Sequence, residues 1–544
     1  MGISFTSDQQ KVIDTRHKNI LVSAAAGSGK TAVLVERIVQ LVTDDAHPVD
    51  IDRLLIVTFT SAAASEMRER ISNALMKRME TNPENEHLQR QMTLIHNAQI
   101  TTIDSFCLFV IRNNFNDIGL DPGFRVADEA ELQLMRKDVL AKVLEEQFAL
   151  KNPEFYHCVE CYSTNGREKS LEEFIFQLYQ FAMSYPFPEK WLQKCKESYE
   201  VESVEELQNT GWIQDMYLQV RQILQDCEEQ MQEALQICEL PDGPYMYADL
   251  LHTEIDMVKQ IKNNGSYETW FASFSNLSFG RLPSKKDDSV SVEKREMVKG
   301  IRNGIKETLQ KLKENYFWIS PQQTLQDMQQ AAPAVRTLID LTLEFKKALA
   351  EQKREKNLID FSDMEHFALQ ILLTEEGGEI VPSKAAIGYQ EYFEEILIDE
   401  YQDSNWVQEY LLQSISKESS GGFNRFMVGD VKQSIYKFRL ARPEIFMEKY
   451  ESYQGEKESK IRIDLKQNFR SREEVIESVN FFFSQIMIEG LGGVKYDRDA
   501  ALYLGASYPM TEVSESEATQ DNRTEILLIE KCTEEKPDNQ NQLK

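Results

Sequence analysis

A run of small residues followed by lysine and threonine is the first feature of this sequence that could do chemistry. The segment AAAGSGKT, residues 24–31, lies between a predicted strand and a predicted helix and matches a phosphate-binding loop, except that Ala24 replaces the first glycine. In such a loop the backbone amides curl around phosphate oxygens, Lys30 reaches the terminal phosphates and Thr31 binds Mg²⁺. A small-residue loop without phosphate function is the alternative, which the flanking strand and helix disfavour. The expected ATP-binding residues here are Ala24, Ala25, Ala26, Gly27, Ser28, Gly29, Lys30 and Thr31.

A pair of carboxylates follows a second apolar run, in LIDEYQD at residues 397–403. An apolar strand that ends in adjacent acids suits MgATP hydrolysis, with Asp399 as the Mg²⁺ ligand and Glu400 as the general base that polarises water. A cluster that caps a helix is the alternative. Lys30 and these acids are far apart in the sequence. They could still meet, because parallel strands bring their carboxyl ends to one edge of a sheet.

Alternating strand and helix patterns surround both motifs. The predicted strands are 19–24, 53–60, 99–104, 394–400, 425–430 and 460–469, and predicted helices include residues 30–42 and 61–79. Long amphipathic helical patterns fill the region between Pro122 and Asn357, with loops expected in the Gly- and Ser-containing stretch 263–291. We therefore expect an α/β fold with a parallel sheet and a large inserted helical domain.

Length and charge limit the classes of protein. A chain of 544 residues exceeds one hydrophobic core, so two to four domains are expected. The net charge of −29 opposes nucleic-acid binding on average, but the acid is uneven: residues 191–256 hold 15 Asp/Glu against 3 Lys/Arg. That stretch suits a solvated or partner-facing helical surface. No signal peptide or long apolar run is visible, and the seven scattered cysteines favour a reducing, cytoplasmic location without a membrane partner.

The order and wording of several further motifs resemble the UvrD/Rep-like superfamily 1 DNA helicases. Gln9 in FTSDQQ stands at the adenine-reading position of that family. VTFTSAAASEMRERI (57–71) is similar to a motif that contacts single-stranded DNA, and TTIDSFC (101–107) resembles the next one, although Asp104 stands where many members have His. The resemblance implies DNA contacts from Thr58, Phe59, Thr60 and Thr102.

Two later segments extend the resemblance. In VGDVKQSIYKFRLA (428–441), Gln433 would sense the γ-phosphate, while Tyr436 and Phe438 would present rings to DNA bases. In LKQNFRS (465–471), Phe469 would lie near the adenine and Arg470 on the γ-phosphate. Core packing is the alternative for the aromatic residues, and a structural ion pair is the alternative for Arg470.

The wording AAAGSGKTAVLVERI, the variant DSFC and LDPGFRVADEAE (120–131) resemble the AddA family of helicase–nuclease subunits within this superfamily. The resemblance implies RecA-like motor domains, ATP and Mg²⁺ as cofactors, 3′→5′ movement on DNA, action at DNA ends in double-strand break repair by recombination, and an AddB-type nuclease partner in a heterodimer. The implied domains are residues 1–121 and 357–455 for the first motor domain, 122–356 for the helical insertion and 456–544 for the start of a second motor domain.

Two later helicase motifs and a nuclease metal cluster do not follow Ser471 in the sequence. We therefore expect a motor fragment without the nuclease domain. A fragment that binds nucleotide and single-stranded DNA without productive unwinding is one alternative, and another kind of P-loop ATPase, such as a metabolic kinase, is a second.

Overall fold

The computed structural model describes residues 4–163, 169–285, 287–455, 459–488, 494–508 and 524–527. The chain divides into two compact units, the first formed by residues 1–103, 387–404 and 415–544 and the second by 104–386 and 405–414. This division differs from the expected boundaries, because residues 104–121 and 357–386 pack with the helical block. Within the described residues, no helix is long and apolar enough to cross a membrane.

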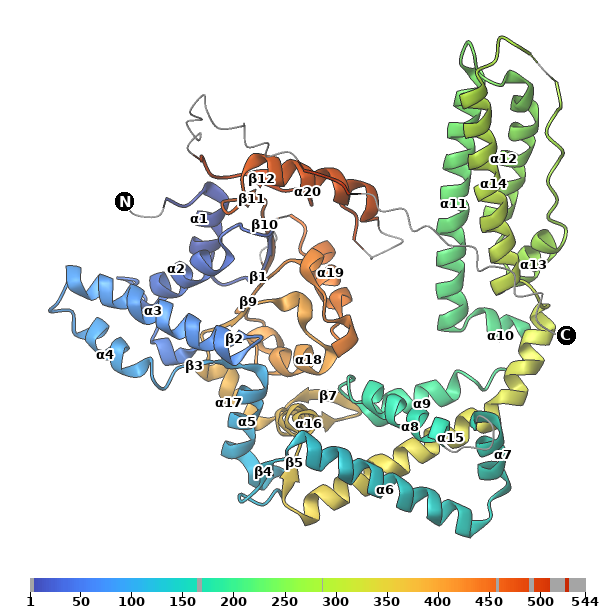
Figure 1. Ribbon diagram of the computed structural model, residues 1–544. Helices are drawn as coiled ribbons and strands as arrows, with labels where there is room; N and C mark the ends of the chain where they lie inside the picture. Colours follow the sequence, from blue (N-terminus) through green and yellow to red (C-terminus); the bar gives the residue numbers. More distant parts are fainter. Residues whose placement is uncertain are drawn as a thin grey trace, which may run out of the picture. The chain divides into compact units, whose positions relative to one another are not determined.

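A six-stranded sheet forms the centre of the first unit (Figure 1), in the order β10-β1-β9-β8-β2-β3. Every neighbouring pair of strands in this sheet is parallel. The strands are β1 (Asn19–Ala24), β2 (Leu54–Thr58), β3 (Gln99–Thr102), β8 (Glu395–Ile398), β9 (Arg425–Gly429) and β10 (Lys460–Leu465). The predicted parallel α/β sheet is therefore confirmed.

The strands are apolar because both faces of the sheet are covered. Ile20 and Val22 enter a core shared with the helices of this unit, and Leu21 between them is equally buried. The helices of the unit are α1 (Ser7–Asp14), α2 (Lys30–Val42), α3 (Ser61–Thr81), α4 (Glu86–Leu94), α19 (Pro443–Ser452) and α20 (Glu473–Ile486).

The strand at residues 460–465 corrects one predicted boundary. We expected residues 456–544 to begin a second domain, but β10 pairs with β1 from Asn19↔Lys460 to Ala24↔Leu465 and completes the first sheet. Its apolar residues Ile461 and Ile463 lie in the same core as Ile20. A short parallel pair follows, between β11 (Gln467–Asn468) and β12 (Tyr503–Leu504).

The second unit is mainly helical. In one part α11 (Gly211–Glu239), α12 (Ala248–Lys262) and α14 (Val292–Tyr316) pack side by side (Figure 1). Their shared core includes Leu224, Val258 and Leu309. The buried pair Arg302–Glu254 joins two of these helices. In the other part α6, α7 and α8 pack on the 35-residue helix α15.

The helices of the second unit are α5 (Ile103–Asn114), α6 (Glu129–Leu150), α7 (Pro153–Tyr162), α8 (Lys169–Ala182), α9 (Pro188–Glu197), α10 (Val204–Gln208), α11 (Gly211–Glu239), α12 (Ala248–Lys262), α13 (Tyr267–Ser275), α14 (Val292–Tyr316), α15 (Pro321–Glu355), α16 (Phe361–Leu372), α17 (Lys384–Tyr392, which continues into the first unit) and α18 (Trp406–Ser414). Two small sheets complete it, β4 (Arg125–Val126) with β5 (Leu358–Ile359) and β6 (Leu373–Glu376) with β7 (Glu379–Pro382). Helix α13 lies inside the stretch that we expected to be loop.

Candidate active site and DNA-facing surface

The small-residue loop follows β1 and ends at the N-terminus of α2. Gly27 and Gly29 have φ angles of +70° and +81°, a left-handed conformation that a side chain would strain. Gly29 is the N-cap of α2, and Lys30 is its first residue. The turn therefore directs the first amides of α2 and the Lys30 side chain toward the carboxyl edge of the sheet, an arrangement that favours anion binding.

The two carboxylates lie at the end of β8 in the same sheet. Glu400 has a φ of +53°, and its backbone amide donates to Asp399 Oδ1 at 3.0 Å. Lys30 Nζ lies 3.3 Å from Glu400 Oε2, so the phosphate-binding loop and the acidic pair meet as predicted. Burial, and then the charge of Glu400, raises the pKa of Asp399 to about 6.

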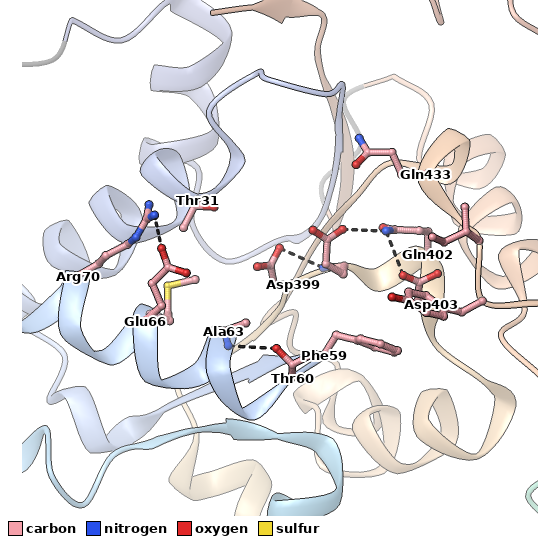
Figure 2. A pocket seen from close by; sticks show the side chains of 14 residues that line it. Thr31, Phe59, Thr60, Ala63, Glu66, Arg70, Asp399, Gln402, Asp403 and Gln433 are labelled. Carbon is pink, nitrogen blue, oxygen red and sulfur yellow. Dashed lines mark hydrogen bonds and ion pairs between the residues drawn. The ribbon is translucent and has the colours of Figure 1, made fainter. Parts of the chain in front are cut away.

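A cavity of about 400 Å³ opens beside this pair. Thr31, Asp399 and Gln433 line it (Figure 2). Glu400 is also part of its lining. The cavity also brings in Asp403, whose pKa is raised to about 6 by burial and by the charge of Glu400. A hydroxyl and a carboxylate at the mouth of a phosphate-binding loop are the ligand types that Mg²⁺ uses when it also binds substrate phosphates.

Hydrogen bonds connect the carboxylates to the loop after β9. Gln402 Nε2 donates to Glu400 Oε2 at 2.8 Å, and Gln402 Oε1 accepts from the Asp430 amide at 3.0 Å. Gln433 Nε2 donates to Asp430 Oδ2 at 2.8 Å. Glu400 and Gln433 were assigned from the sequence, whereas Gln402 and Asp430 between them were missed. Asp430 directly follows β9 and Gln402 lies four residues after the end of β8, and these positions were the available signal.

The remaining predicted nucleotide residues surround the loop. Gln9 Nε2 donates to the Ser28 carbonyl at 2.9 Å, and Gln9 Oε1 accepts from the Thr6 amide at 3.0 Å. The Phe469 amide donates to the Gly27 carbonyl at 2.8 Å, and Arg470 is exposed next to it. Gln9 and Phe469 therefore contact the loop, and Arg470 is the next residue after Phe469.

Asn468 is a further residue of this region, and it was not assigned from the sequence. Its Nδ2 donates to the Ala26 carbonyl at 2.9 Å, and its Oδ1 accepts from the amides of Arg470 and Ser471, both at 2.8 Å. A Cβ on Gly27 would lie 2.8 Å from the Asn468 amide nitrogen, so the loop needs glycine at this position. Asn468 thus fixes the segment that carries Arg470 against the loop.

The loop fits a nucleotide triphosphate by its own chemistry. Ser28 Oγ is buried and has no hydrogen-bond partner within the described residues, and Lys30 supplies a cation beside it. Thr31 and Asp399 line the adjoining cavity and carry oxygen atoms of the type that Mg²⁺ binds. The donor set therefore matches MgATP.

Two aromatic side chains, Phe59 and Tyr436, help to line the same cavity. Phe59 and Tyr436 stack with ring centroids 4.9 Å apart, and Phe438 follows Tyr436 at 5.9 Å. Phe59 is 39% exposed and Phe438 is 75% exposed, which excludes core packing for both rings. Arg439 lies over both Tyr436 and Phe438. Exposed rings with a neighbouring cation suit stacking with the bases of a single strand.

Two of the predicted threonines end neighbouring strands, Thr58 on β2 and Thr102 on β3, and Thr60 is the N-cap of α3. Thr58 at the end of β2 pairs in register with Thr102 at the end of β3. The Thr58 hydroxyl donates to the Thr60 carbonyl at 3.1 Å, and the Thr60 hydroxyl caps α3 by accepting from Ala63. Thr58 is buried and Thr60 is exposed, so Thr60 is better placed to meet a ligand.

Comparison with known families accounts for this combination of ATP loop, acidic pair and aromatic surface. Residues 5–454 match the model described as the UvrD/REP helicase N-terminal domain. The chain belongs to the UvrD/REP helicase family. Membership in this family implies a RecA-like fold for the six-stranded sheet.

Curated relatives cover nearly the whole chain. It is 48% identical over 540 residues to a protein of Lachnoclostridium phytofermentans that is named as the A subunit of an ATP-dependent helicase/nuclease, and the match covers 98% of this chain and 39% of that protein. Proteins with the same name from Acetivibrio thermocellus and Bacillus pumilus are 43% and 42% identical, over 98% and 97% of this chain and 43% and 42% of their own lengths. The chain thus spans about two fifths of the length of these relatives.

Proposed function

We propose that this chain is the ATP-driven motor of a DNA helicase that translocates on single-stranded DNA. The observation that carries the proposal is the 3.3 Å pair between Lys30 of the phosphate-binding loop and Glu400 at the end of β8. It unites a phosphate-binding cation and a general base at one edge of a parallel sheet. Family membership and the relatives' shared name support the same reaction.

In this proposal each nucleotide-site residue has one task. Lys30, Thr31 and Asp399 hold MgATP, whose Mg²⁺ neutralises phosphate charge when bound. Glu400 orients and polarises the attacking water. The other tasks follow the family resemblance: Gln9 and Phe469 face the adenine, while Gln433 and Arg470 respond to the γ-phosphate.

The DNA path in this proposal follows the aromatic surface. Phe59, Tyr436 and Phe438 stack on successive bases, and Thr58, Thr60 and Thr102 mark the neighbouring backbone contacts. The shared cavity supports coupling, because Phe59 and Tyr436 line the same space as Glu400 and Gln433. A structural change at the nucleotide on hydrolysis would then act directly on the rings that stack with bases.

The biological setting is proposed from the relatives' name and the motif resemblance. We place the motor in a bacterial cytoplasmic helicase–nuclease heterodimer with an AddB-type partner, moving 3′→5′ from DNA ends during double-strand break repair by homologous recombination. Residues after β10 would begin a second RecA-like domain, the largely helical residues 122–356 form the insertion, and exonuclease activity would belong to a nuclease domain outside residues 1–544.

A second candidate is the alternative left open by the sequence, a chain that binds nucleotide and single-stranded DNA without productive unwinding. A fluorophore–quencher duplex with a 3′ or a 5′ single-stranded tail separates the two. ATP-dependent strand separation from the 3′-tailed duplex supports the motor with its polarity. Binding of a fluorescent ATP analogue and of oligonucleotide without strand separation supports the second candidate, and failure to bind either ligand contradicts both.

A further inference from the structure

Gln402 is a buried glutamine whose side chain connects two functional segments. Its side chain is almost fully enclosed, at 1% exposure. Its Nε2 donates to Glu400 Oε2 at 2.8 Å, while its Oε1 accepts from the backbone amide of Asp430 at 3.0 Å. Nε2 also donates to Asp403 Oδ2 at 3.4 Å. Both ends of the carboxamide are therefore used, and these partners fix its orientation.

The room for this side chain depends on a glycine. A Cβ on Gly429 would lie 2.3 Å from Gln402 Oε1, far inside contact distance, and 3.2 Å from the Gln402 backbone nitrogen. Gly429 has no positive φ that would itself require glycine. The absent side chain at the end of β9 therefore makes the space that the Gln402 carboxamide occupies.

The carboxylate that Gln402 holds belongs to the proposed general base. Glu400 Oε2 faces two donors, Gln402 at 2.8 Å and Lys30 at 3.3 Å. Lys30 is also the cation that must reach the phosphates, so nucleotide binding draws it away from Glu400. The bond from Gln402 then remains to fix the carboxylate, and small displacements of a catalytic group are costly.

We propose that Gln402 is a positioning residue that holds the Glu400 carboxylate and ties it to the backbone of the loop after β9. The inference rests on the proposed function, since it concerns the base of that reaction. Asp430 also accepts from Gln433, and Tyr436 follows in the same loop. A movement of this loop on DNA binding would therefore reach Glu400 through the Gln402 side chain.

The kinetic test compares two glutamines in equivalent bonds. Gln402→Met removes the hydrogen-bond donor and acceptor but keeps a side chain of similar length. Gln408→Met is the matched control, because Gln408 Nε2 also donates to a buried carboxylate, that of Glu365 in the second unit, at 2.8 Å. We expect Gln402→Met to lower the kcat of single-strand-stimulated ATP hydrolysis by about 10- to 100-fold. The KM and the Kd of a fluorescent ATP analogue should change by less than about threefold, since uniform binding is unaffected.

Gln408→Met should leave kcat unchanged. In a Glu400→Gln background, Gln402→Met should cause no further fall in single-turnover rate, because the group it positions is already gone. The inference would be overturned if Gln402→Met left kcat unchanged, or if KM rose by the same factor by which kcat fell. Additive losses in rate when Gln402→Met is combined with Glu400→Gln would also overturn it. Wild-type protein that binds no nucleotide would instead overturn the proposed function.

The packing of Gly429 against Gln402 can be measured without nucleotide. Gly429→Ala should lower the melting temperature, because the new Cβ collides with the Gln402 carboxamide. Gln402→Ala should remove part of that penalty, so that the double variant melts above the value expected from adding the two single shifts. Strictly additive shifts would show that Gly429 does not make room for Gln402, and would overturn the inference.

Discussion

Lys30 Nζ and Glu400 Oε2 lie 3.3 Å apart although 370 positions separate them in the sequence. The pair exists because β1 and β8 lie in one parallel sheet, with only β9 between them. Lys30 is partly buried and Glu400 is more exposed. A phosphate that enters the loop therefore competes with Glu400 for the lysine, and binding leaves the carboxylate able to act on water.

Removal of the lysine should weaken ATP binding. For Lys30→Ala we expect a loss of about 2 kcal/mol in MgATP affinity, roughly 30-fold in Kd, as for one charge-assisted hydrogen bond. Titration of a fluorescent ATP analogue measures it. Lys417→Ala is the control, because Lys417 forms a surface pair with Glu394 in the same unit. Equal Kd values for Lys30→Ala and wild type would contradict the assignment of the loop.

Removal of Mg²⁺ should reveal the role of Asp399. In wild-type protein, EDTA should weaken binding of the ATP analogue, because Asp399 and Thr31 no longer share a cation with the phosphates. In Asp399→Asn the difference between Mg²⁺ and EDTA should shrink severalfold, since the carboxylate ligand is lost. If Mg²⁺ and EDTA gave the same difference in affinity for Asp399→Asn as for wild type, Asp399 would not be a ligand of the metal.

The stacked rings should carry single-strand affinity. Phe59→Ala and Tyr436→Ala should each weaken binding of a labelled oligo(dT) by about 1–3 kcal/mol, the usual value of one base–aromatic stack. Fluorescence anisotropy at fixed salt measures the change. Phe174→Ala is the control, because Phe174 on α8 is 43% exposed, close to the 39% of Phe59. If all three variants bind alike, the rings do not form the DNA surface.

Glu365 should make stability depend on pH. Burial in the second unit raises the pKa of Glu365 from 4.5 to about 7, although Gln408 donates a hydrogen bond to its carboxylate. The folded protein thus keeps a proton that the unfolded chain releases. The protonated Glu365 contributes its whole share to the free energy of unfolding below pH 4.5. This contribution, up to roughly 3 kcal/mol, is lost as the pH rises through about 7.

Urea unfolding of wild type and Glu365→Gln across pH 4.5–8 isolates this effect. The variant should gain stability relative to wild type as pH rises, and the gain should level off above pH 7. The corresponding change at Glu375, an exposed carboxylate on β6, controls for loss of one charge. A stability difference that does not vary with pH would contradict the buried-carboxyl account.

Local patterns predicted the elements that hold the site. The apolar run 19–24 and the glycine loop after it place β1 and α2 at the bounds that the structure shows, and the end of β8 delivers Asp399 as expected. Helix α13 was missed because its start, a capping box between Ser266 and Thr269, lies in a stretch rich in Gly, Asn and Ser. Short polar signals of this kind favour loops and helix caps alike.

Long-range partners could not be predicted from the sequence. That β10 joins the first sheet depends on its pairing with β1, which no local pattern encodes. The bonds of Gln402 to Glu400 and Asp430, and of Asn468 to Ala26, likewise depend on which strands are neighbours. Sequence motifs were sufficient to predict the residues with chemical roles. The residues that orient them could be identified only from the strand order of the folded sheet.

Steady-state ATP hydrolysis, with and without oligo(dT), tests the central claim most directly. The wild-type protein should hydrolyse MgATP faster when single-stranded DNA is present. Glu400→Gln should bind the ATP analogue but lose hydrolysis by about 10²- to 10⁴-fold, the usual contribution of a general base. Hydrolysis that ignores DNA, or that survives in Glu400→Gln, would contradict the account of this chain as a DNA-driven ATPase motor.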